Sequence, residues 1–406
     1  FRSGDEALRG LYALDGSDAS LEKGRERAVR VVRAFEAEFG ARPEAALFSG
    51  PGRTEIGGNH TDHQHGRVLC GSVDLDMLAC AAPNGTDLVR IQSEGYPALE
   101  VDLRDLKVRE EEKNSSPALV RGVAARLAEL GCRPAGFDAY VTSTVLSGSG
   151  LSSSAAYEIL VATIIDCFFG GGTLDPVERA KVGQYAENVY FGKPCGLMDQ
   201  MGSSVGGAVA IDFADPAAPV VKKVEYDFTR SGHALCIVDT GSCHADLTDD
   251  YADITREMGA VAAHFGKKFL RDVDEGAFRA ALPQLRQECG DRAVLRTMHF
   301  FEEDCRAEQE AQALEQGDFA AFLALVDQSG LSSALNLQNT WSAAAPQQQA
   351  IPVALAVGRE LLGGSGAIRV HGGGFAGTIQ AFVPNEKLET FQQGMEELLE
   401  IGRAHV

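Results

Sequence analysis

The most informative segment of the sequence is a loop of glycines and serines, which reads Ser147-Gly148-Ser149-Gly150-Leu151-Ser152-Ser153-Ser154-Ala155. It follows a strand-like run, 136–145, and opens an apolar helix, 151–169, that the glycines at 170–172 end. Glycine lets the backbone approach a ligand closely, and the free N–H groups and the dipole at a helix start favour an anion. The loop therefore predicts a cradle for phosphate, with a flexible linker or a simple helix cap as the alternatives.

Two familiar motifs are absent from this loop. No Lys follows the glycines as in a Walker loop, and no serine has glycine both two residues before and two residues after it, as a nucleophile elbow requires. In addition to binding phosphate, the loop could supply one serine hydroxyl as a ligand of a magnesium ion that accompanies the phosphate.

The composition is that of a globular chain of two domains. Of its 406 residues 45% are hydrophobic and 23% are charged, which is enough apolar material for a full core. A chain of this length is too long for one small core, so two domains are expected. The net charge of −21 repels phosphate backbones and anionic lipid, so we expect neither nucleic acid nor a membrane as a partner. The nine scattered cysteines indicate a reducing compartment, and no apolar span of about 20 residues or secretory signal is visible. We predict a cytoplasmic location.

The pattern of apolar residues predicts two α+β domains, 1–225 and 226–406. In the first we expect helices at 21–39, 117–130 and 176–189, and strands at 46–48 and 206–213. Residues 49–52 have the composition of a turn, and strands 68–82 and 87–103 are expected to form a hairpin over Pro83-Asn84-Gly85. In the second we expect helices at 251–265, 291–316, 319–327, 347–362 and 386–400, with a strand–turn–strand at 369–383.

A second polar segment, 51–66, contains Arg53, Asn59, His60, Asp62, His63 and His65 between two turns. Such side chains offer donors and acceptors suited to a polyhydroxyl ligand. Imidazole and carboxylate groups are also ligands of zinc and iron, so a metal site is a competing prediction. On spacing alone, a solvated loop ranks first, a sugar site second and a metal site third.

Two later segments carry further chemistry. Glu187 and Asp199 lie twelve residues apart across a turn of proline and glycine, where one carboxylate could hold a metal and the other accept a proton. The glycines of His371-Gly372-Gly373-Gly374-Phe375-Ala376-Gly377 would let the backbone lie against a bound phosphate. In isolation, capping carboxylates and a glycine hairpin are the simpler interpretations.

Together and in this order, the four segments resemble those of the GHMP kinases and, within them, the galactokinase family. Gly52-Arg53 with Gly58, His60-Thr61-Asp62 and Gly66 is similar to the galactokinase sugar signature. Gly150-Leu151-Ser152-Ser153-Ser154-Ala155 resembles the ATP-phosphate motif, Pro194-Cys195-Gly196-Leu197-Met198-Asp199-Gln200 the segment with the catalytic Asp, and Gly372-Gly373-Gly374-Phe375 the third GHMP motif. The resemblance covers nearly the whole chain.

The resemblance implies a two-domain α+β GHMP kinase fold, with a ribosomal-S5-like N-terminal domain for sugar and ATP phosphate and a ferredoxin-like C-terminal domain. It also implies a monomeric galactokinase that phosphorylates the anomeric hydroxyl of galactose with ATP and Mg2+. By motif position, Asp199 is the implied catalytic base, Arg53 its charge partner, and Ser153 and Glu187 the implied metal ligands. The implied sugar contacts are Asn59, His60, Asp62, His63, Cys195, Gly196 and Tyr251. The implied nucleotide contacts are Gly148, Ser149, Gly150, Leu151, Ser152, Ser153, Ser154, Ala155 and Gly373.

The sugar signature departs from the family at three positions. Galactokinases usually have Asn two residues after the Arg, Glu before the His and Tyr after the Asp, whereas this chain has Glu55, Asn59 and His63. The run 60–64 resembles the H-x-D-H-Q of plant galacturonate kinases, so a 1-kinase for galacturonate or another hexose derivative is the alternative. A protonated His63 would attract a sugar carboxylate. Galactose is favoured because Asn59 adds no fixed cation and can hydrogen-bond a C6 hydroxyl.

A non-catalytic sugar sensor is a further alternative, as some fungal paralogues are. Those proteins lack a Ser-Ala pair in the phosphate motif, whereas Ser154-Ala155 is present here. Catalysis is therefore favoured over sensing.

Overall fold

The computed structural model describes residues 5–13, 17–145, 150–242 and 247–399, and the chain divides into two compact units. The first unit contains Phe1–Arg53, Ser72–Ser147 and Leu151–Gly207, and the second contains Thr54–Gly71, Gly148–Gly150 and Ala208–Val406. The main boundary thus follows Gly207, not residue 225 as predicted, and two earlier segments join the second unit. The reason is that strands β1 (Ala46–Gly57) and β2 (Arg67–Pro83) are long and each contributes to both units.

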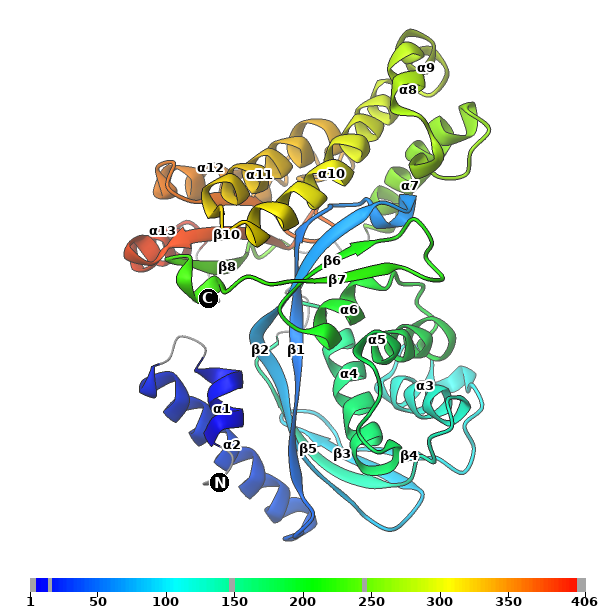
Figure 1. Cartoon of the computed structure of the whole chain (residues 1–406), viewed down its shortest axis with the longest axis vertical. Coiled ribbons are helices and arrows are strands. Elements are labelled where there is room, and N and C mark those ends of the chain that lie inside the picture. Colours follow the sequence, from blue (N-terminus) through cyan, green and yellow to red (C-terminus); the bar gives the residue numbers. More distant parts are fainter. Residues whose placement is uncertain (1–4, 14–16, 146–149, 243–246, 400–406) are drawn as a thin grey trace. The chain divides into compact units, whose positions relative to one another are not determined.

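The first unit is built on a sheet in the order β4-β3-β5-β2, formed by β3 (Leu88–Ser93), β4 (Leu99–Asp102), β5 (Phe137–Ser143) and the end of β2 (Figure 1). β3 is parallel to β5, whereas β2 is antiparallel to it over Met77–Pro83. Because β5 lies between β2 and β3, the predicted hairpin over Pro83-Asn84-Gly85 is wrong. The turn exists, but the strands on its two sides do not pair with each other.

Helices cover both faces of this sheet (Figure 1). The helix α2 (Asp18–Phe39) covers one face, and α3 (Ser116–Glu129), α4 (Ser153–Ile165) and α5 (Pro176–Tyr185) cover the other. Side chains of β2 alternate between the two faces: Leu78, Cys80 and Ala82 pack with α2, while Ala79 and Ala81 belong to the opposite core. The unit also contains α1 (Asp5–Tyr12) and α6 (Met198–Val205).

The helix α4 continues as a π-helical turn, Asp166–Gly170. In the described ranges, Ser153–Gly170 is the one helical run long and apolar enough to cross a membrane, and 56% of it is buried. Its apolar residues Leu160, Val161 and Ile165 lie in the core of the first unit. Packing in that core accounts for the apolar composition of this run.

The strand β1 runs straight through the predicted turn at 49–52, so that prediction is wrong. Its glycines serve close packing: a Cβ on Gly50 would lie 2.5 Å from the carbonyl oxygen of Ala156, and one on Gly52 would lie 3.2 Å from that of Leu151. Only glycine therefore lets this strand approach the start of α4 closely.

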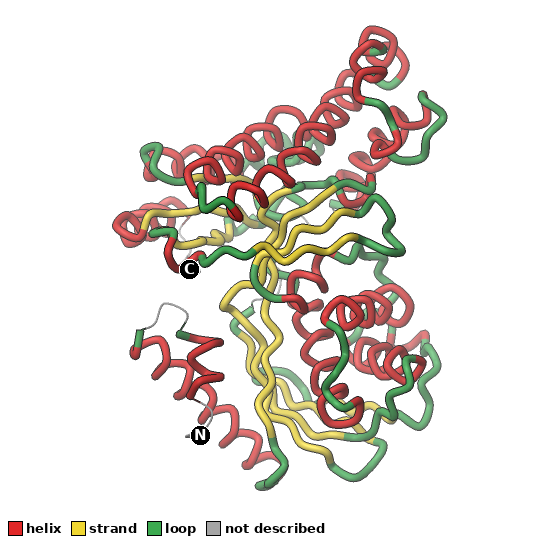
Figure 2. The backbone as a smooth tube through the Cα atoms, viewed as in Figure 1, coloured by secondary structure: helices red, strands yellow, loops and turns green. Residues whose placement is uncertain are grey.

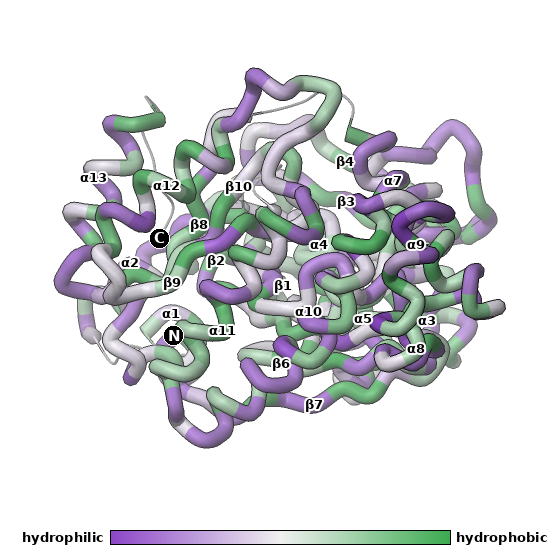
Figure 3. The backbone as a smooth tube through the Cα atoms, turned by 90° about the horizontal axis from the view of Figure 1, so that it is seen from above, coloured by the Kyte–Doolittle hydropathy of each residue, from purple (hydrophilic) through white to green (hydrophobic). Residues whose placement is uncertain are grey.

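The second unit carries β6 (Ala208–Asp212) and β7 (Val220–Val224), which extend the beginning of β2 in the order β2-β6-β7. A separate antiparallel sheet, in the order β8-β10-β9, consists of β8 (His233–Asp239), β9 (Ala367–Val370) and β10 (Thr378–Pro384). The helices α12 (Ala350–Leu362) and α13 (Leu388–Leu399) pack on one face of it, and α11 (Phe319–Ser332) packs with Ala367 and Phe382 of the other. Hydrophilic and hydrophobic residues alternate along α13 in Figure 3, and its Phe391 and Met395 enter the core.

A helical layer completes this unit (Figure 2). It consists of α7 (Thr248–His264), α8 (Glu275–Ala280), α9 (Leu282–Glu288) and the long α10 (Asp291–Glu315), and their apolar residues form one core with Leu270 and Phe375. The predicted long helices correspond to α7, α10, α11, α12 and α13, and the predicted strand pair to β9 and β10. The predicted α+β class with two parts is confirmed.

Replacing Gly50 by Ala tests the close packing of β1 on α4. The added Cβ would also lie 3.0 Å from Leu160 Cβ, so either the strand or the helix must shift. We expect Gly50→Ala to destabilise the protein by about 1–3 kcal/mol, as overpacked cores do, and to lower the midpoint of thermal unfolding. The control is Gly10→Ala in α1, where no atom lies within 4 Å of an added Cβ. Equal midpoints for the two variants would show that this contact is not tight.

Candidate active site

Arg53, Ser152 and Asp199 form a closed set of hydrogen bonds in the first unit. Nη2 of Arg53 donates to Ser152 Oγ and to Asp199 Oδ1, and Ser152 Oγ donates to Asp199 Oδ2 at 2.5 Å. The Arg53 side chain is 7% exposed, whereas that of Asp199 is 34% exposed. Both carboxylate oxygens are thus oriented by protein donors while the group stays open to a ligand, which is the arrangement that a general base requires.

Three local structures place these side chains. Arg53 lies in β1, and its backbone N–H donates to Leu151 O at 3.0 Å, which fixes the strand against the residues before α4. Ser152 has φ 54° and ψ 61°, a left-handed conformation that non-glycine residues adopt rarely and often at functional sites. Asp199 lies in the first turn of α6, where the helix dipole stabilises a negative charge. No helix was predicted over Met198–Val205, so α6 was not foreseen from the sequence.

At the start of α4, three backbone N–H groups make no hydrogen bond with any described residue. Its first internal hydrogen bond runs from Ala156 N–H to Ser152 O at 3.0 Å, so the N–H groups of Ser153, Ser154 and Ala155 precede the helical ladder. This arrangement suits an anion such as phosphate. Of the other predicted nucleotide contacts, Gly148 and Ser149 lie outside the described residues. Gly150 belongs to the second unit, where a Cβ on it would lie 3.0 Å from His371 and Thr378.

Glu187 lies beside this helix start, in a π-helical turn, Ala186–Phe191. Its carboxylate is 3% exposed and accepts hydrogen bonds from Ser154 Oγ at 3.4 Å and from Gln200 Nε2 at 2.9 Å, with Lys193 Nζ at 3.5 Å. The structure thus brings the hydroxyl of Ser154 to Glu187, whereas the family resemblance named the neighbouring Ser153. Gln200, which follows Asp199 directly, orients the carboxylate.

Glu158 is a second buried acid next to Glu187. Gln200 Nε2 donates to Glu158 Oε2 at 3.0 Å as well as to Glu187. Burial and then the charge of Glu187 raise the pKa of Glu158 well above its usual range, so its neutral form is favoured relative to an exposed glutamate. No sequence motif pointed to Glu158, because its role depends on a contact across the fold.

The residues around Glu187 fit a magnesium ion that is shared with a nucleotide. Mg2+ in such sites takes one or two protein carboxylates and completes its shell with phosphate oxygens and water. One carboxylate and a serine hydroxyl beside a helix start that suits an anion match that donor set. In the described part of the chain, no three His, Cys, Asp or Glu side chains gather as a metal site of their own. The competing metal prediction for 60–65 has no such cluster to support it.

The sugar signature, residues 51–66, lies mainly in the second unit. Its His60 is partly exposed and lies next to Tyr251 of α7. The rings of these two residues stack with centroids 6.2 Å apart, and Tyr251 is 37% exposed. His60 Nε2 donates to Gly373 O at 2.9 Å, and the Tyr251 hydroxyl donates to Gly374 O at 3.2 Å. Asp62 is partly exposed at the start of a short 3-10 turn, Asp62–Gln64. These groups are available to a polyhydroxyl ligand.

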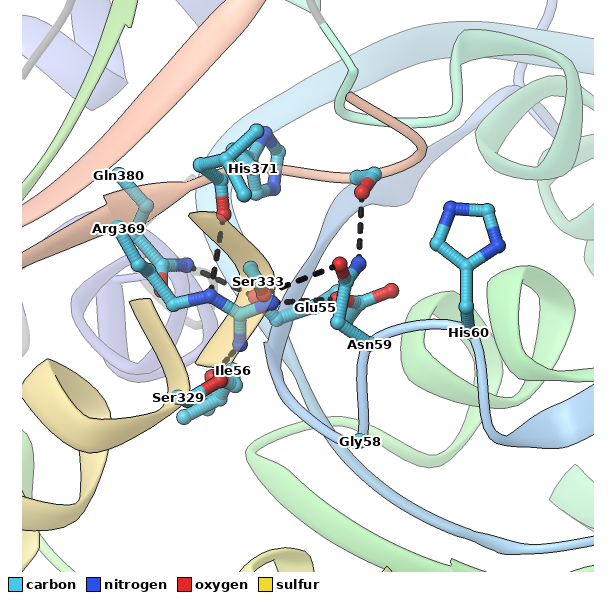
Figure 4. A network of polar contacts seen from close by, with 12 residues as sticks. Glu55, Ile56, Gly58, Asn59, His60, Ser329, Ser333, Arg369, His371 and Gln380 are labelled. Carbon is cyan, nitrogen blue, oxygen red and sulfur yellow. Dashed lines mark hydrogen bonds and ion pairs between the residues drawn. The ribbon is translucent and has the colours of Figure 1, made fainter. Parts of the chain in front are cut away.

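Asn59, by contrast, is fully buried, and its amide is completely used within the protein (Figure 4). Nδ2 donates to Glu55 Oε1 at 2.8 Å and to Gly372 O at 2.7 Å. Oδ1 accepts from Asn339 Nδ2 at 2.8 Å and from Ser333 Oγ at 3.4 Å. In this structure the side chain of Asn59 therefore has no group left for a C6 hydroxyl.

The charge of Glu55 is balanced by Arg369, which is also fully buried (Figure 4). Nη2 of Arg369 donates to Glu55 Oε1 at 2.9 Å, Nη1 to Ile56 O at 2.5 Å and Nε to Val370 O at 3.0 Å. A buried charge needs such partners, because removing one of them leaves the other uncompensated. Arg369 was not predicted, since nothing in its sequence neighbourhood marks it.

The remaining predicted sugar contacts differ in exposure. Both ring nitrogens of His63 are buried and have no partner among the described residues, and burial lowers the pKa of His63 to about 4. The Cys195 thiol lies 3.7 Å from Gln200 Nε2, and burial, followed by the charge of Glu187, raises its pKa. Gly196 is exposed. Attraction of a sugar carboxylate by His63 requires a protonated ring, and with this lowered pKa the ring is neutral at neutral pH.

Comparison with known proteins assigns the family. The galactokinase galactose-binding signature matches residues 33–83, and the GHMP kinase N-terminal domain matches residues 118–207. A galactokinase of Streptomyces coelicolor is 31% identical over 363 residues, which cover 89% of this chain and 90% of that protein. The structure of Lactococcus lactis galactokinase complexed with galactose matches with a TM-score of 0.76 at 23% identity over 92% of this chain and 94% of that one. The structure of Methanococcus jannaschii mevalonate kinase matches with a TM-score of 0.63 at 15% identity, over 90% of this chain and 98% of that one.

The fold, together with the helix start at Ser153 and the acid at Asp199, defines a GHMP kinase, a class of phosphotransferase that uses ATP. Within this class the chain belongs to the galactokinase family and is a sugar kinase. The predictions of family, fold and enzyme class are thereby confirmed.

The buried His299 beneath Asn59 predicts a pH dependence of stability. Its Nε2 donates to Asn59 O and its Nδ1 accepts from Ser332 Oγ, both at 2.9 Å, and burial lowers its pKa from 6.5 to about 4. Between these two values the unfolded chain binds more protons than the folded one, so the free energy of unfolding decreases as pH falls through this window. His299→Gln keeps one donor and one acceptor but does not titrate. We expect its slope against pH to be smaller by up to about 1.4 kcal/mol per pH unit in denaturation at pH 4.5–7. Parallel slopes would contradict the buried, neutral state of His299.

Proposed function

We propose that this chain is a galactokinase that transfers the terminal phosphoryl group of ATP to the anomeric hydroxyl of galactose. The observation that carries the proposal is the Asp199 carboxylate, which is oriented by Arg53 and Ser152 and partly exposed. It lies beside a helix start whose first N–H groups have no partner among the described residues. A proton acceptor next to an anion-binding helix start is what phosphoryl transfer to a hydroxyl needs.

In the proposed mechanism, Asp199 orients the attacking hydroxyl and finally accepts its proton. Phosphoryl transfer passes through a loose transition state whose charge is spread over the equatorial oxygens, so positioning and electrostatics supply most of the rate. The N–H groups of Ser153, Ser154 and Ala155 act on that charge. Arg53 keeps Asp199 in place and adds a positive charge nearby. A magnesium ion bound by Glu187 and a serine of the loop would neutralise part of the charge on the phosphates.

For the sugar we propose contacts with His60, Asp62 and Tyr251, while Cys195 and Gly196 rest on the family resemblance alone. The positions that suggested a uronate supply no positive charge: Asn59 is neutral and buried, and burial lowers the pKa of His63 to about 4. The nearby cation, Arg369, is balanced by Glu55. These features favour a neutral sugar over galacturonate, since a carboxylate without a cationic partner pays its desolvation uncompensated.

A substrate screen tests the proposal. ATP-dependent turnover would be measured by ADP release over galactose, N-acetylgalactosamine, galacturonate, glucuronate, glucose and arabinose, with the position of the phosphate determined by phosphorus NMR. We expect galactose to give the highest kcat/KM and a 1-phosphate as product. A clear preference for a uronate would overturn the choice of sugar, and binding of galactose without ADP release would favour the sensor.

Replacing Asp199 by Asn tests the assigned base. The amide keeps the size of the side chain but cannot accept the proton, so we expect kcat to fall by more than about 10²-fold while galactose affinity changes much less. Asp105→Asn is the control, because Asp105 is a surface carboxylate of the same unit with 52% exposure. Turnover within a few-fold of the parent protein for Asp199→Asn would remove Asp199 from this role.

A further inference from the structure

Three successive carbonyl oxygens of the glycine loop, residues 372–374, accept hydrogen bonds from side chains of the second unit. Two of the donors, Asn59 and His60, belong to the sugar signature, and the third is Tyr251, whose ring stacks on His60. Gly372 O accepts from Asn59 Nδ2 at 2.7 Å, Gly373 O from His60 Nε2 at 2.9 Å and Gly374 O from the Tyr251 hydroxyl at 3.2 Å. The loop that the resemblance assigns to phosphate is thus bonded to His60 and Tyr251, which we propose as sugar contacts, and to Asn59, which directly precedes His60.

The carbonyl contacts fix the direction of the N–H groups of this loop. A peptide group is planar and trans, so its N–H points opposite to the carbonyl of the preceding residue. Orienting the carbonyls of Gly372 and Gly373 therefore orients the N–H groups of Gly373 and Gly374. Neither of these two N–H groups has a hydrogen-bond partner among the described residues. They remain available to an anion.

Close packing keeps the glycine loop against these partners. A Cβ on Gly373 would lie 2.5 Å from the Tyr251 ring, and one on Gly374 would lie 2.1 Å from Asn339 O. Gly374 also has φ 78°, a conformation that favours glycine. The loop has little freedom to move independently of the side chains that it touches.

Asn59 is the most firmly held of the three donors. It is fully buried, and besides the four side-chain contacts given above its backbone O accepts from His299 and its backbone N–H donates to Glu303 Oε1 at 3.3 Å. Its amide joins Glu55 in β1 directly to Gly372. A displacement of residues 55–60 is therefore transmitted to the glycine loop through one rigid side chain.

We propose that Asn59 is a positioning residue through which sugar and nucleotide affect each other's binding. The inference rests on the proposed function: a sugar that contacts His60 stabilises residues 55–60, these hold the carbonyls of the glycine loop, and the N–H groups of Gly373 and Gly374 are then oriented for a nucleotide phosphate. Coupling of this kind is reciprocal, so each ligand increases the affinity for the other by the same factor.

Calorimetric titration tests the coupling. The dissociation constant of galactose is measured with and without magnesium and a non-hydrolysable ATP analogue, for the parent chain and for Asn59→Leu, which has a similar shape but no polar group. We expect the analogue to tighten galactose binding by about five-fold or more in the parent chain, the lower end of typical coupling, and by less than about two-fold in Asn59→Leu. In steady-state kinetics, KM for each substrate should then become independent of the other in the variant.

The matched control is Ser333→Ala, which removes only the 3.4 Å contact to Asn59 Oδ1 and leaves both Nδ2 bonds in place. We expect this variant to keep the coupling of the parent chain. Coupling that survives in Asn59→Leu, or that is lost equally in Ser333→Ala, overturns the inference. Turnover of galactose without any coupling in the parent chain overturns the inference but leaves the proposed function intact, whereas a chain that neither binds nor phosphorylates galactose contradicts both.

A second measurement needs no variant and so does not depend on whether Asn59→Leu folds. Hydrogen exchange of the peptide that covers 371–378 is followed in the parent chain with and without galactose, in the absence of nucleotide. We expect galactose alone to slow exchange in this peptide, because it stabilises the contacts that orient the loop. Unchanged exchange at saturating galactose overturns the inference.

Discussion

The contact of Arg53 with Asp199 is the interaction on which the proposed chemistry depends. Arg53 reaches Asp199 because β1 packs closely on the start of α4, and that packing requires the glycines at 50 and 52. Ser152, held in a left-handed conformation, contributes its hydroxyl to the same carboxylate. The helix start that we propose for phosphate and the segment that carries the acid are therefore joined by direct hydrogen bonds within one unit.

A second buried interaction, between Arg369 and Glu55, explains two departures from the family pattern together. At these positions galactokinases usually have Asn and then Glu, whereas this chain has Glu55 and then Asn59. In this chain the two residues form one hydrogen-bonded pair, in which Asn59 Nδ2 donates to Glu55 Oε1 at 2.8 Å. The charge now lies next to Arg369, where it compensates a fully buried cation. Taken singly, each substitution suggested a change of substrate; as a pair, they are structural partners.

Sequence alone gave much of the fold and the composition of the site, but not its contacts. The long helices such as α10 and α12 were predictable because apolar residues recur at helical spacing, and the motifs around Ser152 and Asp199 were recognisable locally. Residues 49–52 were mistaken for a turn because close packing and turns both require glycine. The hairpin at 83–85 failed because β5, which is far away in sequence, pairs with β2 instead. Asn59 was assigned to the sugar, and Arg369 and His299 were not assigned at all, since burial and partners distant in sequence decide their roles.

A structure of the protein bound to galactose, magnesium and a non-hydrolysable ATP analogue would test the central claim most directly, through the distance from the Asp199 carboxylate to the anomeric oxygen. We predict a hydrogen bond of about 3 Å, with Arg53 and Ser152 still bound to Asp199. An anomeric oxygen that lies beside a different acid, or beyond the reach of Asp199 even through one water molecule, would contradict it.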